Sequence, residues 1–159
     1  MKLHLSGLLL LACALVACSK DDEAPTIVLP VPETFSASLA GANERPNPVA
    51  TTATGSATFS VLNGIATYSI SVTGLSGVPT ASHIHAPADP TIAVGVLVPF
   101  TINNPVATGT IATGTFTATN NTAVTFDSLL VLLRNGKAYV NVHTAANPAG
   151  EVRGTVTKP

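Results

Sequence analysis

Charged and aromatic residues are scarce in this sequence. Of its 159 residues, 9% are charged and 4% are aromatic, and there is no tryptophan. Seven lysine and arginine residues stand against eight aspartate and glutamate residues, so the chain lacks the basic surplus from which a nucleic-acid-binding face is built. Disorder is excluded as well, because a disordered chain combines high net charge with few apolar residues, whereas 46% of these residues are hydrophobic.

Residues that favour helices are also few. There are four glutamates, four lysines and no glutamine, against 22 threonines, 17 valines, 12 glycines and 12 prolines. Because β-branched residues favour strands, and glycine and proline favour turns, we exclude a helical bundle and expect a β-rich fold. The length suits one domain with a hydrophobic core of its own.

No apolar run is long enough to span a bilayer, including the run over residues 8–17. That run follows Lys2 and is typical of the hydrophobic region of a signal peptide. It ends in Leu15-Val16-Ala17-Cys18, which resembles the lipobox of bacterial lipoproteins. We therefore expect a lipoprotein signal peptide over residues 1–17 and a lipid, palmitate included, on Cys18. The alternative is an ordinary signal peptide followed by an incidental cysteine.

Only two cysteines are present, and neither is expected to form a disulfide. Cys13 lies in the segment that signal cleavage would remove, and Cys18 would carry the lipid. The domain must then be held together by its core alone. A triacylated N-terminus anchors a protein stably without crossing the bilayer, so the expected partner of this end of the chain is a membrane.

Residues 18–33 are expected to form an acidic, proline-rich tether. The run from Ser19 to Glu23 resembles the acidic signal that places some Gram-negative lipoproteins on the outer cell surface, although a solvated acidic linker has the same composition. Pro25, Pro30 and Pro32 stiffen the remainder. The expected location is the outer membrane, with the choice between a periplasmic and a surface-exposed orientation left open.

From residue 34 to residue 157 the sequence predicts short alternating strands. Apolar and hydroxyl side chains alternate over 35–39, 57–61 and 66–72, and further strands are expected at 80–86, 93–100, 111–118, 138–144 and 151–157. In the strand at 93–100 we expect Val94, Val96, Val98 and Phe100 on one face. Asn63-Gly64 predicts a two-residue type I′ hairpin. The expected fold class is therefore all-β, an antiparallel Greek-key-like β-sandwich.

One apolar run does not alternate. Leu129 to Leu133 is preceded by Asp127-Ser128 and followed by Asn135-Gly136. Asp127 or Ser128 would cap a short helix near 128–134, and Gly136 would adopt the left-handed conformation at its end. The alternative is a hairpin turn at Asn135-Gly136 between two buried strands. We favour the short helix.

Three histidines fall in two strand segments. The alternation of a strand places His83 and His85 on one face, with Ile84 on the other. In the segment 139–144, the same alternation places Asn141 and His143 on one face. Neutral imidazole is a common metal ligand, and three of them suit Zn²⁺ or Cu²⁺. The other interpretation, which we favour, is that these histidines hydrogen-bond to polar neighbours, with no metal and no cofactor.

Charges also gather near the C-terminus, where Glu151 and Arg153 share a strand face in a domain with few charges. The structural interpretation is a polar network with Asn141, either as a partly buried Glu151–Arg153 ion pair or as separate bonds to loop carbonyls. The functional interpretation is a carboxylate or guanidinium that binds a ligand. We favour the structural one.

These segments together resemble the CHRD domain, a family first described in chordin and found in many bacterial secreted proteins. The resemblance is carried by His83-Ile84-His85, by the run from Gly136 to Thr144 and by the run from Asn147 to Gly154. The turn from Gly41 to Pro46 is also similar to the family's Gly-x-x-Glu-x-Pro-Pro motif, with Asn47 departing at the second proline. The resemblance implies an extracellular all-β module whose molecular activity is largely undefined.

We therefore expect a non-enzymatic surface module that binds a protein, a glycan or a matrix component, but not nucleic acid. No nucleophile, base and orienting acid are arranged as a catalytic set. The alternative is a metal-binding protein, because a His-x-His strand with a distant histidine is similar to the pattern of copper/zinc superoxide dismutases. The further histidines of those enzymes have no counterparts in this chain.

Overall fold

The computed structural model describes residues 29–89, 94–117 and 123–159. The expected signal peptide, Cys18 and most of the expected tether lie outside the described residues. Within them, no helix is long and apolar enough to cross a membrane.

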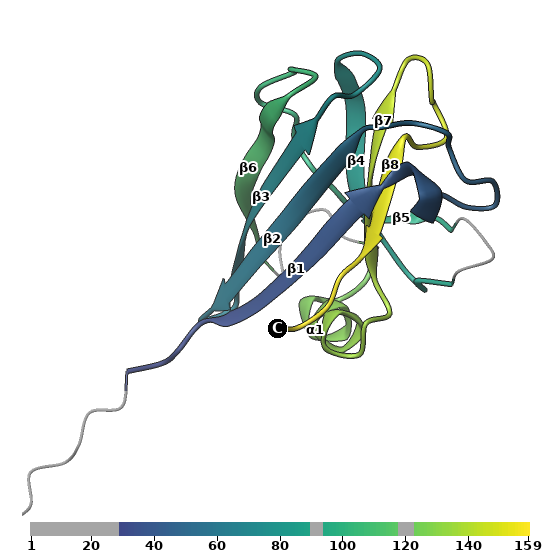
Figure 1. Ribbon diagram of the computed structural model, residues 1–159. Helices are drawn as coiled ribbons and strands as arrows, with labels where there is room; N and C mark the ends of the chain where they lie inside the picture. The colour runs from purple at the N-terminus through teal and green to yellow at the C-terminus, as the bar shows by residue number, and fades with distance from the viewer. Residues whose placement is uncertain (1–28, 90–93, 118–122) are drawn as a thin grey trace, which may run out of the picture.

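In the described residues, the domain consists of eight strands and one α-helix (Figure 1). The strands are β1 (Glu33–Ala40), β2 (Thr54–Leu62), β3 (Ile65–Thr73), β4 (Pro79–His85), β5 (Val96–Pro99), β6 (Gly109–Thr117), β7 (Tyr139–Thr144) and β8 (Val152–Thr155). A 3-10 helix, η1 (Gly41–Asn43), follows β1, and α1 (Phe126–Arg134) lies between β6 and β7. The predicted all-β fold class with one short helix is confirmed.

All eight strands belong to one antiparallel sheet in the order β5-β4-β7-β8-β1-β2-β3-β6. β1 pairs with β2 over its whole length, but its pairing with β8 is limited to Ala40 opposite Arg153. An isolated bridge joins Ser36 to Thr157, just beyond the end of β8. The sheet therefore curls where β1 meets β8, and its two halves face each other (Figure 1). The two layers expected of a sandwich are thus the halves of a single sheet, and the chain crosses between them three times, as in a Greek key.

The hairpin between β2 and β3 turns at Asn63-Gly64, where φ is 50° and 75°. Positive φ at both central residues is the requirement of a type I′ turn, as the sequence predicted. Leu62 pairs with Ile65 across it. The turn fixes the register of both strands, and with it the side of the sheet that each side chain faces.

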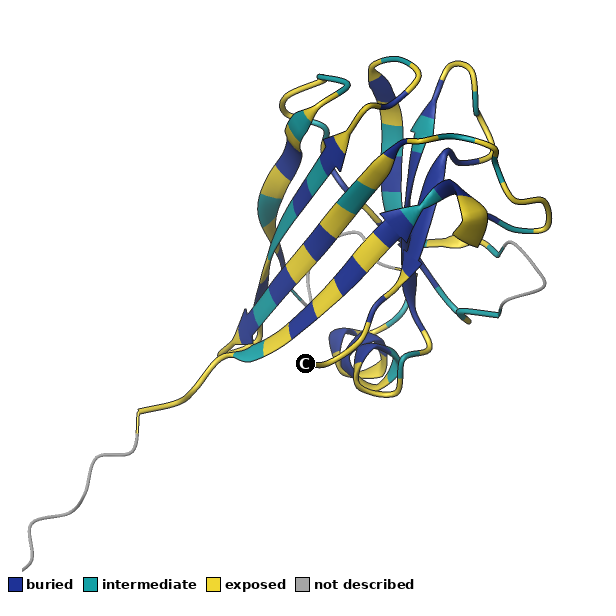
Figure 2. Cartoon of the chain, in the orientation of Figure 1, coloured by how far each residue is buried: buried dark blue, intermediate teal, exposed yellow. Residues whose placement is uncertain are grey.

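The core lies between the two halves of the sheet. On β1 the buried residues Phe35, Ala37 and Leu39 alternate with exposed hydroxyl residues, which produces the stripes on the front strands in Figure 2. The strand near 93–100 departs from this expectation. It is shorter, and Val96 is 41% exposed although Val98 and Phe100 are buried. A register shift between β4 and β5 at Ile84/His85 interrupts the alternation.

Helix α1 covers one end of the core with Leu129 and Leu133, both fully buried. The predicted capping residue was wrong. The N-cap is Thr125, whose hydroxyl accepts a hydrogen bond from the Ser128 amide at 3.2 Å, so the helix begins at Phe126, two residues before the expected start. Gly136 has the positive φ, 62°, expected just beyond the helix.

Candidate metal centre

β4 and β7 pair antiparallel, and this pairing brings the three histidines together. The register places His83 opposite Asn141, and Ala81 opposite His143. Because Ile84 faces the core between the sheet halves, His83 and His85 project from the outer face of β4. Asn141 and His143 project from the same face of β7, since Val140 and Val142 are buried on the other.

The nitrogen atoms of the three side chains converge. His83 Nδ1 lies 3.3 Å from His143 Nε2, although the two residues are 60 positions apart in the chain. One ligand atom from each of His83, His85 and His143 lies within 4.8 Å of the other two. The imidazole rings of His83 and His143 meet edge to face, as do those of His83 and His85.

Backbone carbonyls orient two of the rings. His85 Nδ1 is 2.8 Å from the Val94 oxygen, and His143 Nδ1 is 3.0 Å from the Pro148 oxygen. Because a carbonyl only accepts, each Nδ1 donates and carries the hydrogen, which leaves the Nε2 lone pair for a ligand. This is the outer-sphere arrangement that fixes the tautomer of metal-binding histidines.

The environment keeps all three histidines uncharged. Burial, together with the neighbouring His143 and His85, lowers the pKa of His83 to about 4. Burial also lowers the pKa values of His85 and His143, and it outweighs the hydrogen bonds that their Nδ1 atoms donate to backbone carbonyls. Metal ions bind neutral imidazole, so the site offers its lone pairs at neutral pH.

Tyr139 and Arg153 support the site from one side. The Tyr139 ring stacks on the His85 ring with 4.8 Å between centres and 8° between planes. The Arg153 guanidinium carbon lies 3.5 Å from the centre of the Tyr139 ring, and the guanidinium donates to the Asp89 carbonyl at 2.8 Å. Arg153 is thus bound to an aromatic face and to a loop carbonyl.

Glu151 has a different set of partners. Its carboxylate accepts hydrogen bonds from the Ser76 hydroxyl and Thr144 hydroxyl at 2.6 Å, from the Ser76 amide at 2.8 Å and from the Thr51 hydroxyl at 3.2 Å. Burial alone raises the pKa of this carboxyl, but the bonds from Ser76 and Thr144 outweigh it and the pKa is lowered. Glu151 therefore ties together three segments that are distant in the sequence.

Sequence reasoning did not single out Glu44 as a functional or structural group. It is 3% exposed, its Oε1 has no hydrogen-bond partner in the described part of the chain, and it packs against Gly150. Burial raises its pKa to about 7, against the opposing charges of Arg153 and Arg45. The signal that could have identified it is its place in the Gly-x-x-Glu turn.

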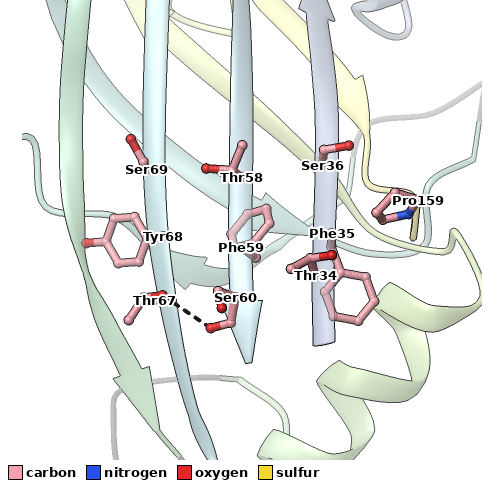
Figure 3. Close-up of a pocket in the computed structure, with 10 residues that line it drawn as sticks. All are labelled: Thr34, Phe35, Ser36, Thr58, Phe59, Ser60, Thr67, Tyr68, Ser69 and Pro159. Atoms are coloured by element: carbon pink, nitrogen blue, oxygen red, sulfur yellow. Dashed lines mark hydrogen bonds between the residues drawn. The ribbon is translucent and has the colours of Figure 1, made fainter. Parts of the chain in front are cut away.

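A second candidate site lies on the outer face of the other half of the sheet. Strand pairing aligns three rows of four residues across β1, β2, β3 and β6, and every one of these twelve residues is serine or threonine. We call this surface the hydroxyl face; its rows are Thr34-Ser60-Thr67-Thr115, Ser36-Thr58-Ser69-Thr113 and Ser38-Ser56-Ser71-Thr110. A shallow groove of about 410 Å³ lies over the first two rows (Figure 3).

The donor atoms of the histidine cluster determine which class of metal ion it suits. Among the described residues, the group able to hold a metal ion consists of His83, His85 and His143, with no carboxylate in it. Imidazole nitrogen suits Zn²⁺, Cu²⁺ and Ni²⁺ better than Ca²⁺ or Mg²⁺, which prefer carboxylate and water oxygens.

Comparison with known protein families identifies the family to which this sequence belongs. The family model described as the CHRD domain matches residues 35–156, which include all eight strands except the first two residues of β1. No curated protein matches the chain.

Proposed function

Because this chain belongs to the CHRD domain family, we propose that it is a binding module that holds one transition-metal ion on His83, His85 and His143. The convergence of these three side chains carries the proposal. A Zn–N bond is about 2.0–2.1 Å, so two ligand nitrogens at the tetrahedral angle lie about 3.3–3.4 Å apart. The His83 to His143 separation of 3.3 Å already has this value.

The proposed activity is binding without catalysis. Zn²⁺ and Cu²⁺ are the ions that fit three neutral imidazoles. The pattern of copper/zinc superoxide dismutases supports a metal at a His-x-His strand. The further histidines of that family have no counterparts in this sequence, which argues against a two-metal centre and against dismutation.

The proposed location is the outer membrane, with Cys18 as the lipid attachment point. The lipobox-like run before Cys18 and the acidic run after it support this. Metabolic labelling with a clickable palmitate analogue tests it: label is expected on the wild-type chain and none on Cys18→Ala. Protease added to intact cells then distinguishes a surface-exposed domain, which is degraded, from a periplasmic one.

Metal titration of the full-length protein tests the proposed binding. We expect one Zn²⁺ or Cu²⁺ per chain against a competing chelator, and at least a hundredfold loss of affinity in the double variant His83→Ala/His85→Ala. Asn103→Ala is the matched control, because Asn103 is exposed and bonds Thr113 on the other half of the sheet. Equal affinities of the double variant and the wild type would disprove the proposal.

A second candidate function is the binding of a neutral glycan by the hydroxyl face. Protein surfaces usually mix charges of both signs, whereas these twelve aligned positions carry none. Hydroxyls donate and accept hydrogen bonds, as sugar hydroxyls do. Co-sedimentation with insoluble neutral polysaccharides tests this. The double variant Thr58→Lys/Ser69→Glu places charge in the groove and should abolish binding. The double variant His83→Ala/His85→Ala should still bind. Binding unchanged by the charged variant would contradict it.

A further inference from the structure

Asn141 lies at the centre of the histidine cluster, and we infer that its side-chain oxygen is the fourth ligand of the metal ion. Its Oδ1 is 3.0 Å from His85 Nε2 and 3.1 Å from His143 Nε2. The inference rests on the proposed function, because it describes how the same site is completed.

The hydrogens on the two histidines show why these contacts point to a cation. His85 and His143 each donate from Nδ1 to a carbonyl, so each uncharged ring has only a lone pair at Nε2. The carbonyl-type oxygen of Asn141 also presents lone pairs. With the oxygen turned toward the rings, three acceptors face one another and repel, and a positive ion between them turns that repulsion into three favourable contacts.

The separations are within a few tenths of an ångström of those in a tetrahedral coordination shell. Ligand atoms about 2.0–2.2 Å from a Zn²⁺ ion lie about 3.3–3.6 Å from one another at tetrahedral angles. Three of the six edges are 3.0 Å, 3.1 Å and 3.3 Å, and the histidine atoms are all within 4.8 Å of each other. Small rotations of the rings therefore suffice to complete a shell of three nitrogens and one oxygen.

The position of Asn141 is fixed by its surroundings. The residue is 4% exposed, and its backbone oxygen accepts a hydrogen bond from the buried Ser82 hydroxyl at 2.8 Å. It pairs with His83 on one side and with Arg153 on the other. A buried amide held in this way is already placed for binding, so little conformational entropy is lost when the ion enters.

The same amide also stabilises the metal-free site. Turned about its Cβ–Cγ bond, Asn141 presents its NH₂ group, whose two hydrogens match the two Nε2 lone pairs. Neither the buried amide nor the imidazoles are then left unsatisfied. Loading the ion exchanges these two N–H···N hydrogen bonds for metal bonds to both Nε2 atoms and, after the amide turns back, to the Asn141 oxygen.

A shell completed by Asn141 is closed. Structural zinc sites use four protein ligands, whereas catalytic ones keep a position for water or substrate. The inferred set of three imidazoles and one amide oxygen therefore leaves no position on the metal for water or substrate. A site of this kind stabilises the fold or stores the ion, and it does not catalyse a reaction.

Co²⁺ loading of the full-length protein tests the fourth ligand, because the visible spectrum of Co²⁺ reports its coordination. The wild-type spectrum is expected to be intense and unchanged by azide, since no position is open. Asn141→Ala should bind Co²⁺ at least tenfold more weakly and show a spectrum that azide shifts. Asn141→Asp, which keeps an oxygen at the same place, should retain wild-type affinity or exceed it, and Asn103→Ala should behave as wild type.

The outcomes separate this inference from the proposed function. Stoichiometric Co²⁺ binding by the wild type, combined with unchanged affinity in a folded Asn141→Ala, would overturn the fourth ligand and leave the three-histidine site standing. An azide-sensitive wild-type spectrum would do the same. No stoichiometric binding by the wild type would overturn both.

Discussion

The guanidinium carbon of Arg153 lies 3.5 Å from the centre of the Tyr139 ring, and the same ring stacks on His85. β8 and β4 flank β7 on opposite sides, so the tyrosine ring is held between a cation and a candidate metal ligand. The most unusual charge in the domain, a buried arginine on its last strand, thereby supports the histidine site.

Replacing Arg153 should affect both stability and metal binding. Loss of a buried cation–π contact and a charged hydrogen bond predicts that Arg153→Ala lowers the free energy of unfolding by about 2–3 kcal/mol. Arg153→Lys should restore only part of it, because an ammonium does not stack as a planar guanidinium does. Urea unfolding measures the loss of stability. Competition with a chelator for Zn²⁺ measures the effect on metal binding, which we expect to be a lower affinity.

Arg134→Ala is the matched control for that measurement. Arg134 forms an exposed ion pair with Glu33 at 2.6 Å, and such pairs contribute about 0–1 kcal/mol. Equal small losses in the Arg134 and Arg153 variants would show that the Arg153 stack does not stabilise the fold.

Glu151→Gln should be among the most damaging isosteric substitutions in the domain. The carboxylate accepts four hydrogen bonds, and an amide would direct its own NH₂ group at donors that need an acceptor. We expect a loss on the order of 3 kcal/mol in the free energy of unfolding. Thr51→Ala removes only the longest of these four bonds, at 3.2 Å, together with the bond that the Thr51 hydroxyl accepts from the Ala53 amide, and should cost about 1 kcal/mol. A Glu151→Gln loss no larger than this would contradict the assigned role.

The local parts of this structure could be predicted from sequence because they depend on alternation and turn chemistry. Asn63-Gly64 specifies its own turn, and a period of two placed His83 and His85 together. The meeting of His83 with His143 depends on the pairing of β4 with β7 across 60 residues. No local pattern encodes that register.

The partners of the charged residues were harder to predict for the same reason. Glu151 and Arg153 are two positions apart, yet Glu151 binds Ser76 and Thr144, and Arg153 binds Tyr139 and a loop carbonyl. Because Ser76 and the Asp89 carbonyl come from distant segments, the sequence showed that the charges were unusual but could not choose between an ion pair and separate bonds.

The histidine site predicts a loss of stability on acidification of the metal-free protein. The pKa of an unfolded histidine is about 6.5, whereas the pKa of folded His83 is lowered to about 4. Between pH 4 and pH 6.5 the unfolded state therefore binds more protons than the folded state. The free energy of unfolding should fall as the pH drops from 6.5 towards 4. His83→Gln should reduce this slope in urea unfolding series; an unchanged slope would contradict the lowered pKa.

Glu44 predicts the opposite pH dependence. Its pKa rises from 4.5 to about 7 on folding, so between these values the folded state holds a proton that the unfolded state has lost. The stability that Glu44 contributes is therefore present below about pH 4.5 and is lost as the pH rises towards 7. Above pH 7 the fold buries a carboxylate whose Oε1 has no hydrogen-bond partner within the described chain.

Glu44→Gln removes that charge and should stabilise the protein on the order of 2 kcal/mol at about pH 8, with little effect at about pH 4. Urea unfolding at the two pH values measures the difference. Glu33→Gln is the control with the opposite sign, because Arg134 and Lys158 lower the pKa of Glu33 to about 2, so its charge stabilises the fold at neutral pH. If Glu44→Gln destabilised the protein equally at both pH values, the carboxylate would be a required partner of Arg153 and its burial would carry no net cost.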